Sequence, residues 1–244
     1  MVDFEFNVHK VLASDRVVSV WDHASLQHRV NQPQWGLQMT QIIDTLGMLS
    51  GKAQGLPGPI TSRAKMTGTD HRLYIYADQN KAIGLLKVGR KKLFIRNATG
   101  SIREIEPLCV LDIYVHETFQ RGGIGKNLFE VMLASEQVLP QKLGYDRPSP
   151  KLISFLKKHY GLAAYVPQAN NFVVFNAYFD SHAAGTDRMG AGGETPQDRR
   201  HPSSFGSEVK PQPRLSAGRS TAPWATDDPP PQRMVQRGGG ARPF

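Results

Sequence analysis

The chain has very little cysteine: Cys109 is the only one in 244 residues. A single cysteine forms no intrachain disulfide and cannot supply the cysteine cluster of a structural zinc site. No run of about 18 apolar residues occurs, so no membrane-spanning helix is expected. The first residues carry early acidic side chains and lack the pattern of a signal or transit peptide. We therefore expect a soluble cytoplasmic protein in a reducing compartment, with no membrane partner and no metal site.

The composition changes near Asp180. Residues 181–244 hold nine of the 17 prolines and nine of the 23 glycines. Such a segment buries too little apolar surface to offset the entropy of ordering it, so we predict a disordered Pro/Gly/Arg-rich tail there and a folded domain over residues 1–180. The net charge of +9 favours an acidic partner. Nucleic acid is not the expected partner, because the basic residues are not interleaved with aromatic side chains that could stack on bases.

Hydrophobic periodicity in residues 1–180 alternates between helix and strand. Apolar residues at helical spacing predict helices over 34–52, 124–138 and 149–160, the last with Ser149 as N-cap, Pro150 at the first helical position and Gly161 as terminator. Short β-type runs predict strands at 72–77, 82–88, 92–96, 108–115, 143–146 and 171–179. An antiparallel meander followed by a βαβαβ order predicts an α+β fold, with a mixed central sheet flanked by helices on both faces.

A glycine-rich turn follows the predicted strand at 108–115. Its backbone N–H groups and the N-terminus of the next helix would favour an anion. A nucleotide P-loop would need a glycine in place of Gln120 and a hydroxyl in place of Asn127, and a dinucleotide fingerprint would need a glycine in place of Leu128. The remaining pattern, Gln120-x-x-Gly123-x-Gly125, resembles the pyrophosphate loop of the GCN5-related N-acetyltransferases (GNAT superfamily), which holds the diphosphate of acetyl-coenzyme A.

Further ordered motifs across residues 1–180 are similar to those of the α-tubulin N-acetyltransferases. They are Asp44-x-Leu-Gly47, Lys52-Ala-Gln54, Pro59-Ile-Thr-Ser62, Val88-Gly-x-Lys-Lys-Leu-Phe94, Glu106-Pro-Leu-Cys-x-Leu-Asp112, Tyr114-x-His-Glu117, Asp146-Arg-Pro-Ser149 and Val166-Pro-Gln-x-Asn-Asn-Phe-Val173. The resemblance implies a GNAT catalytic domain over residues 1–180 that transfers an acetyl group from acetyl-CoA to a lysine ε-amino group. The implied substrate is the luminal loop of α-tubulin in microtubules, which also implies a cytoskeletal location.

Two other functions stay open at this point. One is an acetyltransferase of the same fold that acts on another protein or amine, and the other is a non-catalytic microtubule-binding module.

The chemistry of lysine acetylation calls for a base. A lysine with a pKa of about 10.4 is neutral in roughly one molecule in 2,500 at pH 7, a cost of about 4.6 kcal/mol. The resemblance implies that Asp146 and Cys109 lie where two strands diverge around the cofactor. We expect Asp146 to be essential, provided that burial raises its pKa, and Cys109 either to share the role or merely to line the site. Gln54 matches a residue that the family needs for activity.

The resemblance also implies residues for cofactor and substrate. The predicted cofactor-binding residues are Ile113, Tyr114, Val115, Gln120, Arg121, Gly122, Gly123, Ile124, Gly125, Lys126, Ser149, Pro150, Lys151 and Lys158. The predicted substrate-binding residues are Lys65, Arg90, Lys91, Lys92, Asn171 and Phe172. Lys65 lies where vertebrate relatives carry arginine. The lysine would replace the bidentate contact of an arginine by a point charge.

Overall fold

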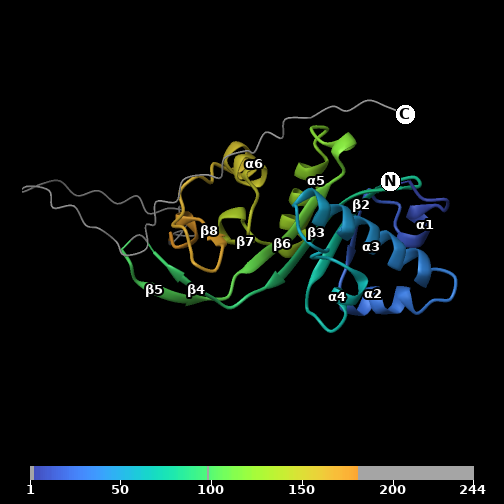
Figure 1. The fold of residues 1–244 in the computed structure, drawn as a ribbon, viewed down its shortest axis with the longest axis horizontal. Helices are drawn as coiled ribbons and strands as arrows, with labels where there is room; N and C mark the ends of the chain where they lie inside the picture. The colour runs from blue at the N-terminus through green and yellow to red at the C-terminus, as the bar shows by residue number, and fades with distance from the viewer. Residues whose placement is uncertain (1–2, 98, 181–244) are drawn as a thin grey trace, which may run out of the picture. The chain divides into compact units, whose positions relative to one another are not determined.

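The computed structural model describes residues 3–97 and 99–180 (Figure 1). The predicted tail, 181–244, lies outside the described residues. The helices are α1 (Val8–Leu12), α2 (His23–Val30), α3 (Gly36–Ala53), α4 (Arg63–Met66), α5 (Ile124–Glu136) and α6 (Pro150–Tyr160). The strands are β1 (Val18–Trp21), β2 (Arg72–Asp78), β3 (Lys81–Arg90), β4 (Leu93–Arg96), β5 (Ile102–Ile105), β6 (Leu108–Val115), β7 (Gly144–Asp146) and β8 (Phe172–Val174). Short 3-10 turns lie at Glu117–Phe119, Pro140–Lys142 and Asn176–Tyr178.

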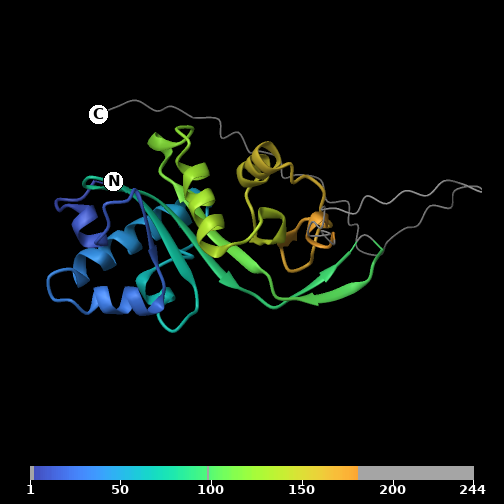
Figure 2. The ribbon, with the colours of Figure 1, turned by 180° about the vertical axis from the view of Figure 1, so that it is seen from behind.

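Six strands form one mixed sheet in the order β1-β2-β3-β6-β7-β8. The pair β6–β7 is parallel and the other neighbouring pairs are antiparallel. Successive side chains of a strand point to opposite faces. In β2, Leu73 and Ile75 pack into the cluster that contains Met39 and Ile42 of α3, whereas Tyr74 packs into the cluster of α5 and α6 (Figures 1 and 2). The predicted α+β fold, with helices on both faces of a mixed sheet, is therefore confirmed.

The predicted helices are present, with ends that follow from their capping residues. The Ser149 hydroxyl oxygen accepts a hydrogen bond from the N–H of Leu152 at 3.2 Å, and Gly161 ends α6 in the left-handed region. Helix α5 stops at Glu136, two residues before the predicted end, because Gln137 takes a left-handed backbone conformation.

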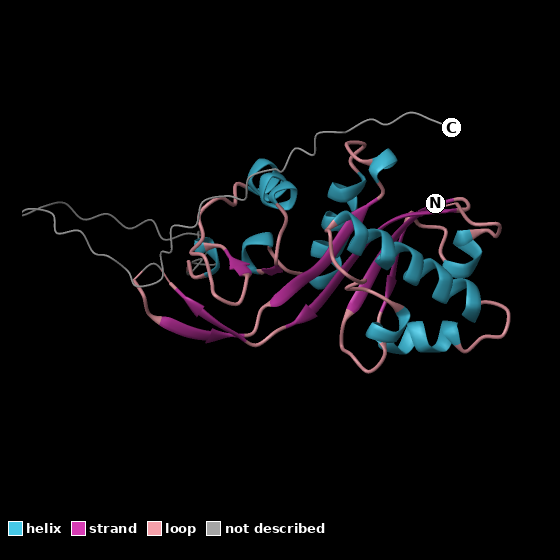
Figure 3. Cartoon of the chain, in the orientation of Figure 1, coloured by secondary structure: helices cyan, strands magenta, loops and turns pink. Residues whose placement is uncertain are grey.

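The predicted pairing of residues 92–96 with the meander is wrong. Strand β3 continues to Arg90 and pairs with β6 on its free edge, so β4 has no position in the main sheet. It pairs instead with β5 in a separate two-stranded sheet (Figure 3). The last predicted strand is also too long, because Phe175 only bridges to Tyr165 and Asn176–Tyr178 is a 3-10 turn.

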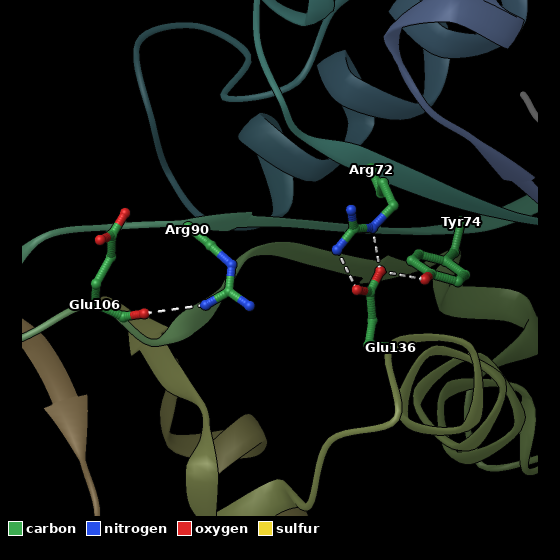
Figure 4. A network of polar contacts seen from close by, with 5 residues as sticks. All are labelled: Arg72, Tyr74, Arg90, Glu106 and Glu136. Carbon is green, nitrogen blue, oxygen red and sulfur yellow. Dashed lines mark hydrogen bonds and ion pairs between the residues drawn. The ribbon is translucent and has the colours of Figure 1, made fainter.

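A polar network fixes the C-terminal end of α5 to β2 (Figure 4). The Glu136 carboxylate accepts hydrogen bonds from the Arg72 guanidinium through both of its oxygens, and from the Tyr74 hydroxyl at 2.6 Å. The carboxylate raises the pKa of Arg72. Arg90, at the end of β3, donates a separate hydrogen bond to the Glu106 carbonyl at 3.2 Å. The contacts of Glu136 hold the C-terminal end of α5 against β2.

Among the described residues no helix has both the length and the apolar character needed to cross a membrane.

Candidate active site

The site lies where β6 and β7 separate. The two strands pair only at Cys109 with Gly144 and at Val110 with Tyr145. On the other side of β6, Leu111 is an extra residue, since Lys87 of β3 pairs with Asp112 and the next residue of β3 pairs with Val110. Such bulges bend a strand and often lie beside active sites. Beyond this point the strands diverge beside a cavity of about 1000 Å³.

The cavity receives residues from several elements. Its lining is Ala53, Gln54, Leu56, Ile60, Leu111, Ile113, Tyr114, Val115, Gln120, Arg121, Gly125, Asp146, Arg147, Pro148, Ser149, Pro150, Lys151, Leu152 and Phe155. Nine predicted cofactor-binding residues are in this lining: Ile113, Tyr114, Val115, Gln120, Arg121, Gly125, Ser149, Pro150 and Lys151. The other predicted ones are not. Gly122, Gly123, Ile124 and Lys126 lie beside the lining in the loop and the first turn of α5, and Lys158 lies on α6.

The glycine loop has the geometry of an anion site. Gly123 is the N-cap of α5 with φ +83°, a conformation that side-chain-bearing residues rarely adopt, and a Cβ added to it would meet no protein atom within 4 Å. The N–H groups of the first turn of α5 lack intrahelical partners. Arg121, Arg147 and Lys151 add positive charge to the lining, and Asp146 is its only carboxylate. Unpaired N–H groups at a helix N-terminus together with these positive charges favour an anionic group such as a diphosphate.

Two side chains of the loop are already engaged. The Gln120 amide donates to the Val115 carbonyl at 2.8 Å, which ties the loop to the end of β6. The Lys126 ammonium lies 3.4 Å from the Glu130 carboxylate, four residues along α5. Gln120 therefore shapes the loop, whereas the charge of Lys126 is partly neutralised.

Asp146 lies at the end of β7, where the strands diverge, and its side chain is half-buried. Burial raises the pKa of Asp146, while the charges of Arg147, Lys91 and Lys87 act in the opposite direction. The Arg147 Nε is 4.0 Å from the carboxylate, a distance at which the pair is weak. The pKa therefore shifts in the direction that a proton acceptor requires.

Cys109 is fully buried where β6 pairs with β7, and it is not in the lining of the cavity. Its thiol donates to the Pro107 carbonyl at 3.6 Å and packs against Gly144, where a Cβ would lie 2.7 Å from the sulfur. Burial, and then the charge of Asp146, raises the pKa of Cys109 to about 12. At neutral pH the side chain is therefore a buried thiol that packs between β6 and β7, and it does not line the cavity as the second of its two expected roles would require.

Gln54, the C-cap of α3, lies in the cavity lining beside a buried polar cluster that sequence reasoning missed. The cluster contains Asp112, Ser50, Thr61 and Lys87. Asp112 and Lys87 are charged residues inside otherwise apolar strands, a rare arrangement unless the charge is paired. These two charged residues in apolar strands were the sequence signal for a buried polar cluster.

The predicted substrate-binding residues divide into two groups. Asn171 and Phe172 lie beside Asp146: Phe172 is its partner across β7–β8, and the Asn171 carbonyl accepts from the Arg147 N–H at 3.1 Å. With Arg147 they line a second opening of about 570 Å³.

The basic residues of the set have partners of their own. The Lys65 ammonium donates to the Pro59 carbonyl, and the Arg90 guanidinium donates to the Glu106 carbonyl. The Lys92 ammonium lies 2.6 Å from the Glu104 carboxylate. Lys91, beside Arg90 at the end of β3, acts electrostatically on Asp146.

The chain is similar to the known members of one protein family. The family described as "GNAT acetyltransferase, Mec-17" matches residues 4–208. The Alpha-tubulin N-acetyltransferase of Tetrahymena thermophila is 48% identical over 189 residues, which are 77% of this chain and 47% of that protein. The Alpha-tubulin N-acetyltransferase 1 of Danio rerio is 54% identical over 153 residues, 60% of this chain and 52% of that protein. The Aedes aegypti Alpha-tubulin N-acetyltransferase is 40% identical over 198 residues, 76% of this chain and 72% of that protein.

The chain spans about half the length of the first two relatives. The match to the family nevertheless covers most of the chain, and the mixed sheet with its diverging β6 and β7 agrees with the GNAT fold. The chain belongs to the Mec-17 family of GNAT acetyltransferases.

Proposed function

We propose that this protein transfers an acetyl group from acetyl-CoA to the ε-amino group of a lysine in the luminal loop of α-tubulin within microtubules. One observation carries the proposal: the lining of one cavity contains both the glycine loop at the N-terminus of α5 and the half-buried Asp146 carboxylate. Relatives at 40–54% identity that are named α-tubulin N-acetyltransferases support the substrate. The same proposal places the protein in the cytoplasm, at microtubules.

Acetyl-CoA, when bound, supplies an acetyl thioester to the site. The segment Gln120–Lys126 and the N–H groups at the start of α5 would hold the diphosphate, with Arg121 and Lys151 as counter-charges. The main chain of Ile113–Val115 has no strand partner on the side of β7 and would bind the amide groups of the pantetheine arm. The residues at the start of α6, Ser149 and Pro150, would flank the adenosine end.

Asp146 is the proposed proton acceptor for the substrate ammonium. Neutralising a lysine at pH 7 costs about 4.6 kcal/mol, and a positioned base typically contributes about 10²–10⁴-fold in rate. The raised pKa of Asp146 makes it a better acceptor than an exposed aspartate. Cys109 contributes packing between β6 and β7 rather than a thiolate, because its pKa is raised to about 12.

Recognition of tubulin is proposed to use the basic residues beside the site. Lys91 and Arg90 lie at the end of β3, next to the β4–β5 sheet, and Lys65 lies on α4. They would face the acidic surface of tubulin, with Asn171 and Phe172 bordering the entrance for the lysine. Lys92 would contribute less, since Glu104 neutralises it.

Initial rates of labelled acetyl transfer test the proposal and separate it from both alternatives. Assembled microtubules, a panel of lysine peptides and small amines are compared at equal amine concentration. A rate on microtubules well above every other acceptor supports the proposal. A faster reaction with another acceptor identifies a GNAT enzyme with a different substrate. Binding to microtubules without any transfer identifies a non-catalytic module.

A further inference from the structure

A buried polar cluster in contact with Gln54, a residue of the cavity lining, joins α3, the α3–α4 loop, β3 and β6. Its centre is the Asp112 carboxylate of β6, which is 4% exposed. Ser50 of α3 and Thr61 of the loop are completely buried beside it. Lys87 of β3 is the cross-strand partner of Asp112 and is also 4% exposed. A buried carboxylate is costly unless it is hydrogen-bonded and paired, so the contacts of this cluster constrain one another.

The direction of each hydrogen bond to Asp112 follows from its chemistry. An ionised carboxylate only accepts. The Ser50 hydroxyl therefore donates to Oδ1 at 2.7 Å, and the Thr61 hydroxyl donates to Oδ2 at 2.6 Å. The Lys87 ammonium supplies the opposite charge nearby and donates to the Ile60 carbonyl at 2.8 Å. Both hydroxyl protons are thus committed to Asp112.

This commitment determines which way the Gln54 carboxamide is turned. Its Nε2 lies 3.1 Å from Oδ1 of Asp112 and 2.9 Å from the Ser50 oxygen. Since Ser50 gives its proton to Asp112, it presents a lone pair to Gln54. The opposite orientation would put Oε1 of Gln54 against a carboxylate and a lone pair, which is repulsive. The amide nitrogen is committed to these two acceptors, and Oε1 is the atom left for a ligand in the cavity.

We propose that Asp112 is a positioning residue that fixes the polarity of Gln54, so that Gln54 offers the incoming amine a hydrogen-bond acceptor and not a donor. The proposal rests on the proposed function, because it takes the ligand to be an amine. When the ammonium gives one proton to Asp146, two N–H bonds remain, and Oε1 of Gln54 accepts one of them. Gln54 consequently orients the lone pair of the amine and does not donate to the thioester oxygen.

A pair of matched variants tests the positioning. Ser50→Ala and Thr61→Val each remove one completely buried hydroxyl that donates to Asp112, but only Ser50 also contacts Gln54. Both variants should lower the melting temperature by similar amounts. Ser50→Ala should raise KM for the acceptor lysine roughly tenfold, the loss expected from one misplaced hydrogen bond. Thr61→Val should raise it less, and acetyl-CoA affinity measured by calorimetry should change less than twofold in both.

An exchange of donor and acceptor tests the polarity. Gln54→Glu alone puts a second carboxylate against Asp112 and should lower kcat/KM at least tenfold. The double variant Gln54→Glu/Asp112→Asn restores a donor facing an acceptor, with the amide now on residue 112, and still presents an oxygen to the cavity. The kcat/KM of the double variant should be at least about tenfold higher than that of Gln54→Glu alone.

The outcomes separate this inference from the proposed function. A parent protein that transfers no acetyl group to any acceptor contradicts the proposed function. If the parent is active, equal KM values in Ser50→Ala and Thr61→Val overturn the positioning role. A folded double variant no better than Gln54→Glu overturns the polarity, and if the double variant does not fold, the comparison of the two hydroxyl variants decides.

Discussion

Replacing Asp146 by asparagine removes the proposed proton acceptor with little change of shape. The carboxylate lies at the end of β7, half-buried in the cavity, and burial raises its pKa. An amide of the same size keeps the contacts of the cavity wall but takes no proton. The substrate lysine must then lose its proton to water before it reacts.

The size of the effect follows from lysine ionisation. The neutral amine is roughly one part in 2,500 at pH 7, and a positioned base typically recovers about 10²–10⁴-fold in rate. We expect Asp146→Asn to lower kcat by a factor in that range at pH 7. The deficit should shrink about tenfold for each unit of pH as the lysine deprotonates in solution, towards its pKa of about 10.4.

The stability of Asp146→Asn should not fall with its activity. Because the folded-state pKa of Asp146 lies above its unfolded value, its stabilising contribution is present only at low pH, below the unfolded pKa, and is lost as pH rises through the folded pKa. At pH 7 the ionised carboxylate is disfavoured in the folded protein. The asparagine variant should therefore melt at the same temperature as the parent or slightly higher, and a loss of activity is not a loss of fold.

The assay is the initial rate of acetyl transfer to microtubules between about pH 6.5 and pH 9, with acetyl-CoA affinity measured in parallel. Asp15→Asn, at an exposed position before the edge strand β1, is the matched control and should behave as the parent. Transfer by Asp146→Asn at the parent rate, with cofactor still bound, would refute the reasoning.

Three further predictions use other parts of the structure. Gly123→Trp should abolish coenzyme A binding by calorimetry without unfolding the protein, whereas Gly100→Trp, at φ +86° in the β4–β5 turn and equally open, carries similar strain and should bind normally. Glu136→Ala should destabilise the protein by about 2 kcal/mol in denaturant titrations, because it leaves two partners on β2 unpaired, while Glu130→Ala, in an exposed pair on the same helix, should cost about 0.5 kcal/mol or less. Cys109→Ala should lower kcat less than about tenfold, and iodoacetamide should label the parent's thiol far more slowly in the folded than in the unfolded protein; rapid labelling of the folded protein would contradict a pKa near 12.

The sequence was most informative where local chemistry decides the structure. The apolar stripe of α3 and the caps Ser149 and Gly161 of α6 depend on residues a few positions apart, and both helices are confirmed. Strands β1 and β5 were not predicted; β5 is mostly exposed on both faces, so no apolar pattern marks it. The position of β4 outside the main sheet depends on β6, which takes the edge of β3, and no local pattern reports that choice.

The same limit applies to the site. The glycine loop was visible because its residues are consecutive, whereas the hydrogen bond from Ser50 to Asp112 joins residues 62 apart in sequence. The structure gives a physical reason for two of the motifs. The Asp44 carboxylate accepts from the Arg63 N–H at 2.7 Å, and a Cβ on Gly47 would lie 1.8 Å from the Thr61 carbonyl oxygen. The motifs at 44–47 and 59–62 thus hold together the loop that carries Ile60 into the cavity.

We propose acetylation of α-tubulin through the cavity where β6 and β7 separate. The most direct test is mass spectrometric mapping of acetyl groups on assembled microtubules incubated with the protein and isotopically labelled acetyl-CoA. We expect label on a lysine of the luminal loop of α-tubulin with the parent protein and none with Gly123→Trp. Label that is absent from that loop, or that persists undiminished with Gly123→Trp, would contradict the proposal.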